Sequence, residues 1–412
     1  MFKVATSILL CCFLFVCLAP GGAFAAEKKE KKSKSPEKKT SSTEKKEKEE
    51  DPFQWTLSLE VPLYYSSNVF QTPSEPFINP ETGNFAEATP SSGWFFEPQL
   101  GLELEYRWTD WMIFGFTNKS QWTRHLEGDF LTPADGNESK NSFFYRGESS
   151  DQKWELGREA KTSNYNYLHR GTGQTRVSKS KKKDIADRYR YSYSGNYLKY
   201  KLKFLSDYKF SLGYDKIKKD YIEIEGYSSL DRDEITEDFS LSKSWGKQLK
   251  LKLNHEVVTL NYHTAFAYNS LGKRDGGILQ QIEETTDELE LDIGPKSLRL
   301  SPTLTKVESL DTHQGFWSFS ESEAALELQY KLRKRLYLIG SYSSRNRQYL
   351  NETNVYGQVR SQTGKIQGLA LEYALSKSQD MSFEYQQESQ IDDDTYYSFE
   401  ETEITMTYIL EF

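Results

Sequence analysis

The feature that most constrains this chain is an alternation of apolar and polar side chains with a period of two, which starts at Trp55 and recurs to the C-terminus. Between Leu249 and Leu253 leucines alternate with lysines, and between Leu289 and Ile293 apolar residues alternate with acids. Successive side chains of a β-strand point to opposite faces, so this pattern predicts strands and not helices. The alternation is clearest in the segments 55–63, 100–108, 198–204, 249–253, 289–293, 324–332 and 369–375.

The composition limits what such strands can build. Of the 412 residues, 28% are charged and 14% are aromatic, and the mean hydropathy is −0.74. A polytopic helical membrane protein would need several apolar runs of about 20 residues, and a disordered acidic chain would hold few aromatic residues. The sequence therefore predicts an all-β fold, a transmembrane antiparallel up-and-down β-barrel with one face toward lipid and the other toward water.

The connections between the predicted strands are of two kinds. Short turns are expected near residues 110, 206, 246, 294, 334 and 378, and long polar loops at 66–93, 123–141 and 161–187. This asymmetry is typical of outer-membrane barrels. Successive short turns lie 40–48 residues apart, but the interval from 110 to 206 is twice as long. We therefore predict a further turn near Ser149–Lys153 and 16 strands; without that turn the count would be 14.

The first 25 residues have the layout of a signal peptide, with an apolar stretch after Lys3 and a cleavage motif at Ala23-Phe24-Ala25. All three cysteines lie in this segment, so the mature chain would have no disulfide and no thiolate metal site. A lipoprotein signal ending at Cys17 is the alternative. Residues 26–53, rich in Lys and Glu, would form a disordered periplasmic tether able to contact the cell wall, and residues 54–412 would form the barrel.

The last nine residues carry a further pattern. Counted back from the C-terminal phenylalanine, every second position is apolar or aromatic; these positions are Ile404, Met406, Tyr408, Leu410 and Phe412. This ending resembles the assembly signal of Gram-negative outer-membrane β-barrel proteins, of which the porins are an example, and no motif identifies a subfamily. The resemblance implies the outer membrane of a Gram-negative bacterium as the location. It implies outer-membrane lipid, lipopolysaccharide and the outer-membrane assembly machinery as partners.

The charged half of each alternation is expected to line the lumen, because a charge on the lipid face costs about 2–4 kcal/mol at the midplane. The predicted lumen-lining residues are Glu60, Glu103, Glu105, Arg107, Lys199, Lys201, Lys203, Lys250, Lys252, Glu288, Glu290, Asp292 and Glu327. The strands that carry Lys250 and Glu290 are consecutive, so opposite charges can pair across them. Such ladders could orient solutes in a transverse field, or they could be a self-neutralising lining that keeps the wall rigid.

Aromatic residues gather where strands are expected to end, at 94–96, 108–111, 189–197, 316–317 and 396–397. Amphipathic rings favour the headgroup region, so these groups predict girdles at the two membrane surfaces. A sugar-binding aromatic track inside a pore is the alternative.

Residues that could support catalysis or bind a metal are sparse. The five histidines show no metal-binding spacing, and Asp392-Asp393-Asp394 is the one acidic cluster that would suit a hydrolase of lipid or peptide at the rim. The alternative for this cluster is an exposed loop tip that contacts divalent ions of the lipopolysaccharide layer. Residues 51–412 hold 42 basic and 54 acidic side chains, a net charge of −12, which argues against a nucleic-acid partner. The basic run at 179–183 is expected to contact anionic lipid sugars.

These observations predict a porin-like diffusion channel for small polar solutes, with no cofactor, no bound metal and no enzymatic activity. The alternatives are a non-conducting barrel that serves adhesion or envelope structure, and an outer-membrane enzyme that acts on lipid or peptide.

Overall fold

The computed structural model describes residues 51–412 except 79–83, 88, 127–130, 132–133, 167, 169–184, 205–206, 225–226 and 355. The predicted signal peptide, nearly all of the predicted tether, His169 and the basic run at 179–183 lie outside the described residues. Within the described part of the chain, no helix has the length and apolarity needed to cross a bilayer.

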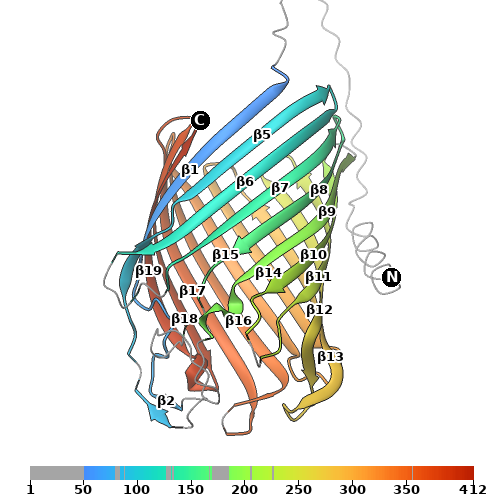
Figure 1. Cartoon of the computed structure of the whole chain (residues 1–412). Helices are drawn as coiled ribbons and strands as arrows, with labels where there is room; N and C mark the ends of the chain where they lie inside the picture. Colours follow the sequence, from blue (N-terminus) through green and yellow to red (C-terminus); the bar gives the residue numbers. More distant parts are fainter. Residues whose placement is uncertain are drawn as a thin grey trace, which may run out of the picture. The chain divides into compact units, whose positions relative to one another are not determined.

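Sixteen strands of the described residues form one closed antiparallel wall (Figure 1). The wall strands are β1 (Phe53–Ser66), β5 (Gln99–Thr109), β6 (Met112–His125), β7 (Gly136–Glu148), β8 (Gln152–Ser163), β9 (Tyr191–Phe204), β10 (Tyr208–Tyr221), β11 (Arg232–Trp245), β12 (Leu249–Tyr268), β13 (Arg274–Ile293), β14 (Leu298–Asp311), β15 (Phe319–Arg333), β16 (Leu336–Thr353), β17 (Val359–Ala374), β18 (Gln379–Asp392) and β19 (Phe399–Glu411). The short strand β4 (Gly93–Phe96) pairs with β1 and β6 at the edge of this wall. Outside it lie the two-stranded β2 (Phe77–Ile78) and β3 (Phe85–Ala86) and the 3-10 turns η2 (Ala186–Tyr189) and η3 (Thr395–Tyr397).

The strand order confirms the predicted up-and-down barrel and its 16 strands. Each strand pairs with its neighbours in the chain, and β1 closes the wall by pairing with both β5 and β19. The turn predicted near Ser149–Lys153 lies between β7 and β8, where the Ser149 N–H donates to the Gln152 carbonyl at 2.8 Å.

The two ends of the wall differ in their connections. The end with the tight turns, here called the short-turn end, also holds the start of β1 and the end of β19 (Figure 1). At the opposite, long-loop end, the β12–β13 connection is an exception, because a tight turn with Gly272 at φ 71° joins two strands of 20 residues each. These two strands therefore continue to a level that other strand pairs span with loops.

The outward face is apolar only in the half nearer the short turns. Directly paired residues share a face; Leu289 pairs with Leu304, which is 55% exposed, whereas two positions further toward the long loops Asp287 pairs with Lys306. The same change from apolar to polar occurs on the other strands. We call this outward belt the apolar band; its members include Leu57, Leu102, Phe116, Phe143, Leu156, Leu198, Leu212, Leu251, Leu289, Leu304, Leu328, Leu338, Leu371, Phe383 and Met406.

A small apolar core lies on the inward face, where Ile113, Phe144 and Tyr197 are buried together. Glycines make room for these rings: a Cβ at Gly115 would lie 2.0 Å from Phe144 Cζ, and one at Gly157 would lie 2.4 Å from Tyr197 Cζ. The rings therefore lie flat against the wall of the lumen, beside the charged residues of β9.

Candidate functional site

An ion pair between two strands that are not neighbours identifies the concave, inward face of the wall. Arg146 of β7 reaches across β6 to Glu105 of β5, which only the inside of a curved sheet permits. Glu103 lies two residues from Glu105 and shares its face. Arg107 lies at the short-turn end, where its guanidinium donates to the Asp110 carbonyl at 3.2 Å.

The ion pairs expected between β12 and β13 are present. Lys250 lies 3.5 Å from Asp292 and Lys252 lies 3.2 Å from Glu290, and each is directly opposite its partner in the register. Glu288 lies 3.9 Å from Lys252. This part of the lumen neutralises its own charge, as a structural lining would.

Four inward lysines of β9 and β10 differ from this ladder. Within the described residues, no carboxylate oxygen lies within 4.0 Å of Lys199, Lys201, Lys203 or Lys209. Lys199 instead places its ammonium 4.6 Å from the centroid of the Tyr197 ring. We call these four residues the lysine wall.

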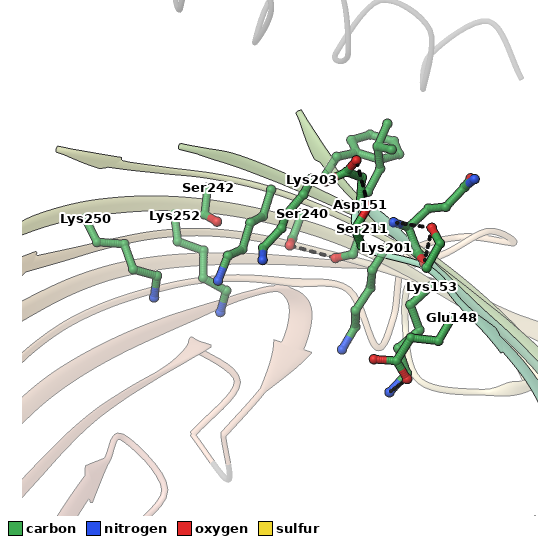
Figure 2. Close-up of a pocket in the computed structure, with 16 residues that line it drawn as sticks. Glu148, Asp151, Lys153, Lys201, Lys203, Ser211, Ser240, Ser242, Lys250 and Lys252 are labelled. Carbon is green, nitrogen blue, oxygen red and sulfur yellow. Dashed lines mark hydrogen bonds and ion pairs between the residues drawn. The ribbon is translucent and has the colours of Figure 1, made fainter. Parts of the chain in front are cut away.

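A recess of about 390 Å³ opens beside the lysine wall (Figure 2). Ser211, Ser240 and Ser242 of β10 and β11 line it, and the hydroxyls of Ser211 and Ser240 lie 2.8 Å apart. Figure 2 shows Lys201 projecting from the sheet. Lys250 and Lys252 of β12, which also line the recess, lie to the left of Lys201 in this view. The recess is present because the serine side chains are much shorter than the lysine side chains around them.

In the described part of the chain, inward acids without a basic partner are most numerous on the opposite side of the barrel; a smaller group, Asp215, Asp238 and Glu256, lies on β10, β11 and β12 near the lysine wall. Among the described residues, inward carboxylates with no basic nitrogen within 4.0 Å include Glu60, Glu327, Glu372, Glu384, Glu388 and Glu403, which we call the acid wall. They belong to β1, β15, β17, β18 and β19. In the 16-strand order, β17 is eight strands from β9 in both directions, so the acid wall and the lysine wall face each other.

Sequence reasoning predicts Glu60, Glu327 and the β9 lysines on the lumen side but misses Lys209, Glu372 and the acids of β18 and β19. The register supplies the missing signal, because Lys209 pairs directly with Lys203 across β9 and β10. Strand pairing could have extended the alternation to it. That acids and bases lie on opposite sides follows only from closure of the sheet.

The acidic cluster at the long-loop end is part of the structure. The Asp392 carboxylate is fully buried and accepts from Arg360 Nε at 2.9 Å and Nη2 at 2.8 Å, and Arg360 lies 3.8 Å from the Tyr397 ring centroid. Asp394 accepts from the Tyr396 N–H at 3.1 Å, and burial raises the pKa of Asp394. The expectation of an exposed loop tip is therefore wrong for Asp392 and Asp394. Asp392 forms a buried ion pair with Arg360, and Asp394 accepts a hydrogen bond from the backbone of η3.

The aromatic girdle is present at some of the expected places. Trp108 and Trp111 are 60% and 52% exposed at the short-turn end, as a girdle requires. Tyr396 is only 5% exposed and packs against Phe77, so the girdle prediction is wrong there.

Each described histidine lies beside an aspartate. The pairs are His125–Asp135, His255–Asp287, His263–Asp233 and His313–Asp275, at 2.7 to 3.4 Å. Within the described residues, no group of three potential metal ligands occurs.

The sequence matches no protein-family model and no curated protein. Solved structures resemble the fold: the anion-selective porin from Comamonas acidovorans aligns with a TM-score of 0.50 and 10% identity over 87% of this chain and 99% of that chain. The chain has the fold of outer-membrane β-barrels. A loop deletion mutant of OmpT from Vibrio cholerae aligns with a TM-score of 0.49 and 10% identity over 88% of this barrel chain and all of that one. OpdK from Pseudomonas aeruginosa aligns with a TM-score of 0.44 and 12% identity over 87% and 99%. A structural likeness at identities this low concerns the fold alone and carries no activity with it.

Proposed function

We propose that this protein is a porin-like diffusion channel for small polar solutes in the outer membrane. The observation that carries the proposal is that the lysine wall lies on β9 and β10, whereas most of the unpaired luminal carboxylates lie on the opposite side of the barrel, from β15 to β1. A purely structural lining would pair its charges, as Lys250 and Asp292 do. Unpaired opposing walls create a transverse field that a polar solute or ion experiences as it passes.

Reconstitution in planar bilayers tests this proposal. The purified barrel should produce stepwise conductance increases, and the two walls should shift ion selectivity in opposite directions. Glu372→Gln with Glu384→Gln should move the reversal potential toward anion preference, and Lys201→Gln with Lys203→Gln toward cation preference, because each pair of substitutions removes two unpaired luminal charges.

Lys306→Gln with Glu308→Gln supplies the control, because these two residues pair with each other at 2.6 Å on the outward face. This control should leave the reversal potential unchanged. A folded wild-type barrel that never conducts would instead support a non-conducting role in adhesion or envelope structure.

The proposal extends to the tether at residues 26–53. The barrel begins and ends at the short-turn end, and in outer-membrane barrels the short turns face the periplasm. The Lys/Glu-rich part of the tether, residues 27–50, is 24 residues long; a flexible chain of that length reaches about 25–30 Å, from roughly 5–6 Å × √n, which is enough to contact the cell wall.

Deletion of residues 27–50 should therefore leave folding and conductance nearly unchanged. A protease added to intact cells should spare the tether and should remove it once the outer membrane is opened, as followed by an antibody against an N-terminal epitope. Cleavage in intact cells would reverse the assigned topology, and a large rise in conductance after the deletion would identify the tether as a plug.

A further inference from the structure

The lysine wall is exceptional among the inward basic residues of the barrel. Most of the others have acidic partners, as in Lys140–Glu159 at 2.7 Å, Lys161–Glu138 at 2.8 Å and Lys219–Glu234 at 2.8 Å. The positively charged ammonium groups of neighbouring lysines repel one another at short range. Glu155 is directly opposite Lys199, but within the described residues none of the four lysines has a carboxylate oxygen within 4.0 Å, so they concentrate positive charge on one side of the lumen.

The strand register makes this concentration stronger. Lys203 and Lys209 are directly opposite each other across β9 and β10, and Lys153 is directly opposite Lys201 across β8 and β9. Like charges at directly opposed positions of a sheet are destabilising. Two acids, Glu148 and Asp151, line the recess beside these lysines, and Glu148 lies 3.9 Å from Lys153, which is at the limit of an ion pair. The arrangement opposes folding stability, and a role in binding would account for it.

The recess beside these lysines offers hydrogen-bond donors in addition to charge. Ser211 and Ser240 have hydroxyls 2.8 Å apart, Ser242 lines the same hollow, and the volume of about 390 Å³ exceeds that of a single small ion. Lysine ammonium groups bind phosphate as point charges with rotatable donors, whereas the arginine fork binds carboxylate or phosphate bidentately. No arginine is among the residues that line this recess.

We propose that the lysine wall and the serine recess form a binding site for small solutes that carry a phosphate group. The phosphate oxygens accept from the ammonium groups of Lys201, Lys203 and Lys209 and from the serine hydroxyls, and the recess holds the uncharged remainder of the solute. The proposal deepens the channel function, since it names the solute class that the lumen favours. Binding itself does not depend on conductance.

Calorimetric titration of the folded barrel in detergent tests the site directly. At constant ionic strength, inorganic phosphate and glucose 6-phosphate should bind to the wild type, and glucose should not. The triple variant Lys201→Gln, Lys203→Gln and Lys209→Gln should bind both phosphates at least tenfold more weakly. Its folding should be at least as good as that of the wild type, because it relieves like-charge contacts; heat-modifiable gel migration checks this.

A matched variant separates a site from a general field. Lys140→Gln, Lys161→Gln and Lys219→Gln remove the same total charge from the lumen at ion-paired positions, and phosphate affinity should fall by less than threefold. Equal losses in the two triple variants, or equal binding of acetate and phosphate by the wild type, would overturn the proposal. So would a wild-type barrel that conducts but does not bind phosphate. Phosphate binding without conductance would instead overturn the channel function and leave the site.

Discussion

Leu328→Arg should destabilise the folded barrel by about 2–4 kcal/mol, the cost of an arginine at the midplane on the lipid face of a barrel. Leu328 is central in the apolar band on β15, where it pairs with Leu300 on one side and Gly340 on the other and is 44% exposed. Urea-induced unfolding in lipid vesicles, followed by tryptophan fluorescence, measures the change.

Two further substitutions on β15 are its controls. Glu327→Gln changes the inward neighbour of Leu328, and Ser320→Arg places the same arginine on the outward face beyond the apolar band. Each should change the free energy of unfolding by about 1 kcal/mol or less, as expected for the lumen and for positions near the interface. Equal destabilisation by Leu328→Arg and Glu327→Gln would mean that the two faces are assigned wrongly.

Deletion of Phe412 should lower the amount of barrel in the outer membrane several-fold while leaving export across the inner membrane intact. The Phe412 N–H donates to the Leu57 carbonyl at 2.9 Å, and its own carbonyl accepts from the Leu57 N–H at 3.3 Å, so this residue completes the β1–β19 seam. It also ends the predicted assembly signal. Membrane fractionation with heat-modifiable gel migration measures insertion.

Phe412→Tyr is the matched variant, because it keeps both backbone hydrogen bonds and an aromatic ring; we expect insertion close to that of the wild type. Normal levels of the deletion variant in the outer membrane would show that neither the seam nor the terminal signal depends on this residue.

The sequence predicts the wall better than it predicts the lumen. Period-two alternation depends on local geometry, so segments such as 324–332 are recognisable without knowledge of their partners. The pattern is weaker in β7 and β8, where Asn141 faces outward beyond the apolar band and Arg158 faces outward directly opposite Phe143. There only the spacing of the turns predicts the hairpin.

The placement of charges shows where sequence reasoning ends. The rule that charges avoid lipid holds for Lys252 and Glu290, which pair on the inward face. It cannot be extended to Asp287 and Lys306, which lie outward because that part of the wall is beyond the apolar band. The opposition of the lysine wall and the acid wall depends on which strands are eight apart in a closed ring, and strand closure is a tertiary property.

The limited height of the apolar band has a consequence for the surrounding lipid. At the end of the chain the outward apolar residues run from Phe412 to Ile404, and on β15 they run from Leu332 to Ala324. At about 3.3 Å per residue each run is roughly 26 Å along the strand, and at the usual barrel tilt of about 35–45° it projects to roughly 19–22 Å. Acyl chains that normally match a band about 25 Å tall would have to shorten or splay around this protein, at a fraction of a kcal/mol for each ångström. Two barrels that share such a thinned annulus deform less lipid than two apart, so membrane elasticity alone would draw copies together and favour regions of short-chain lipid.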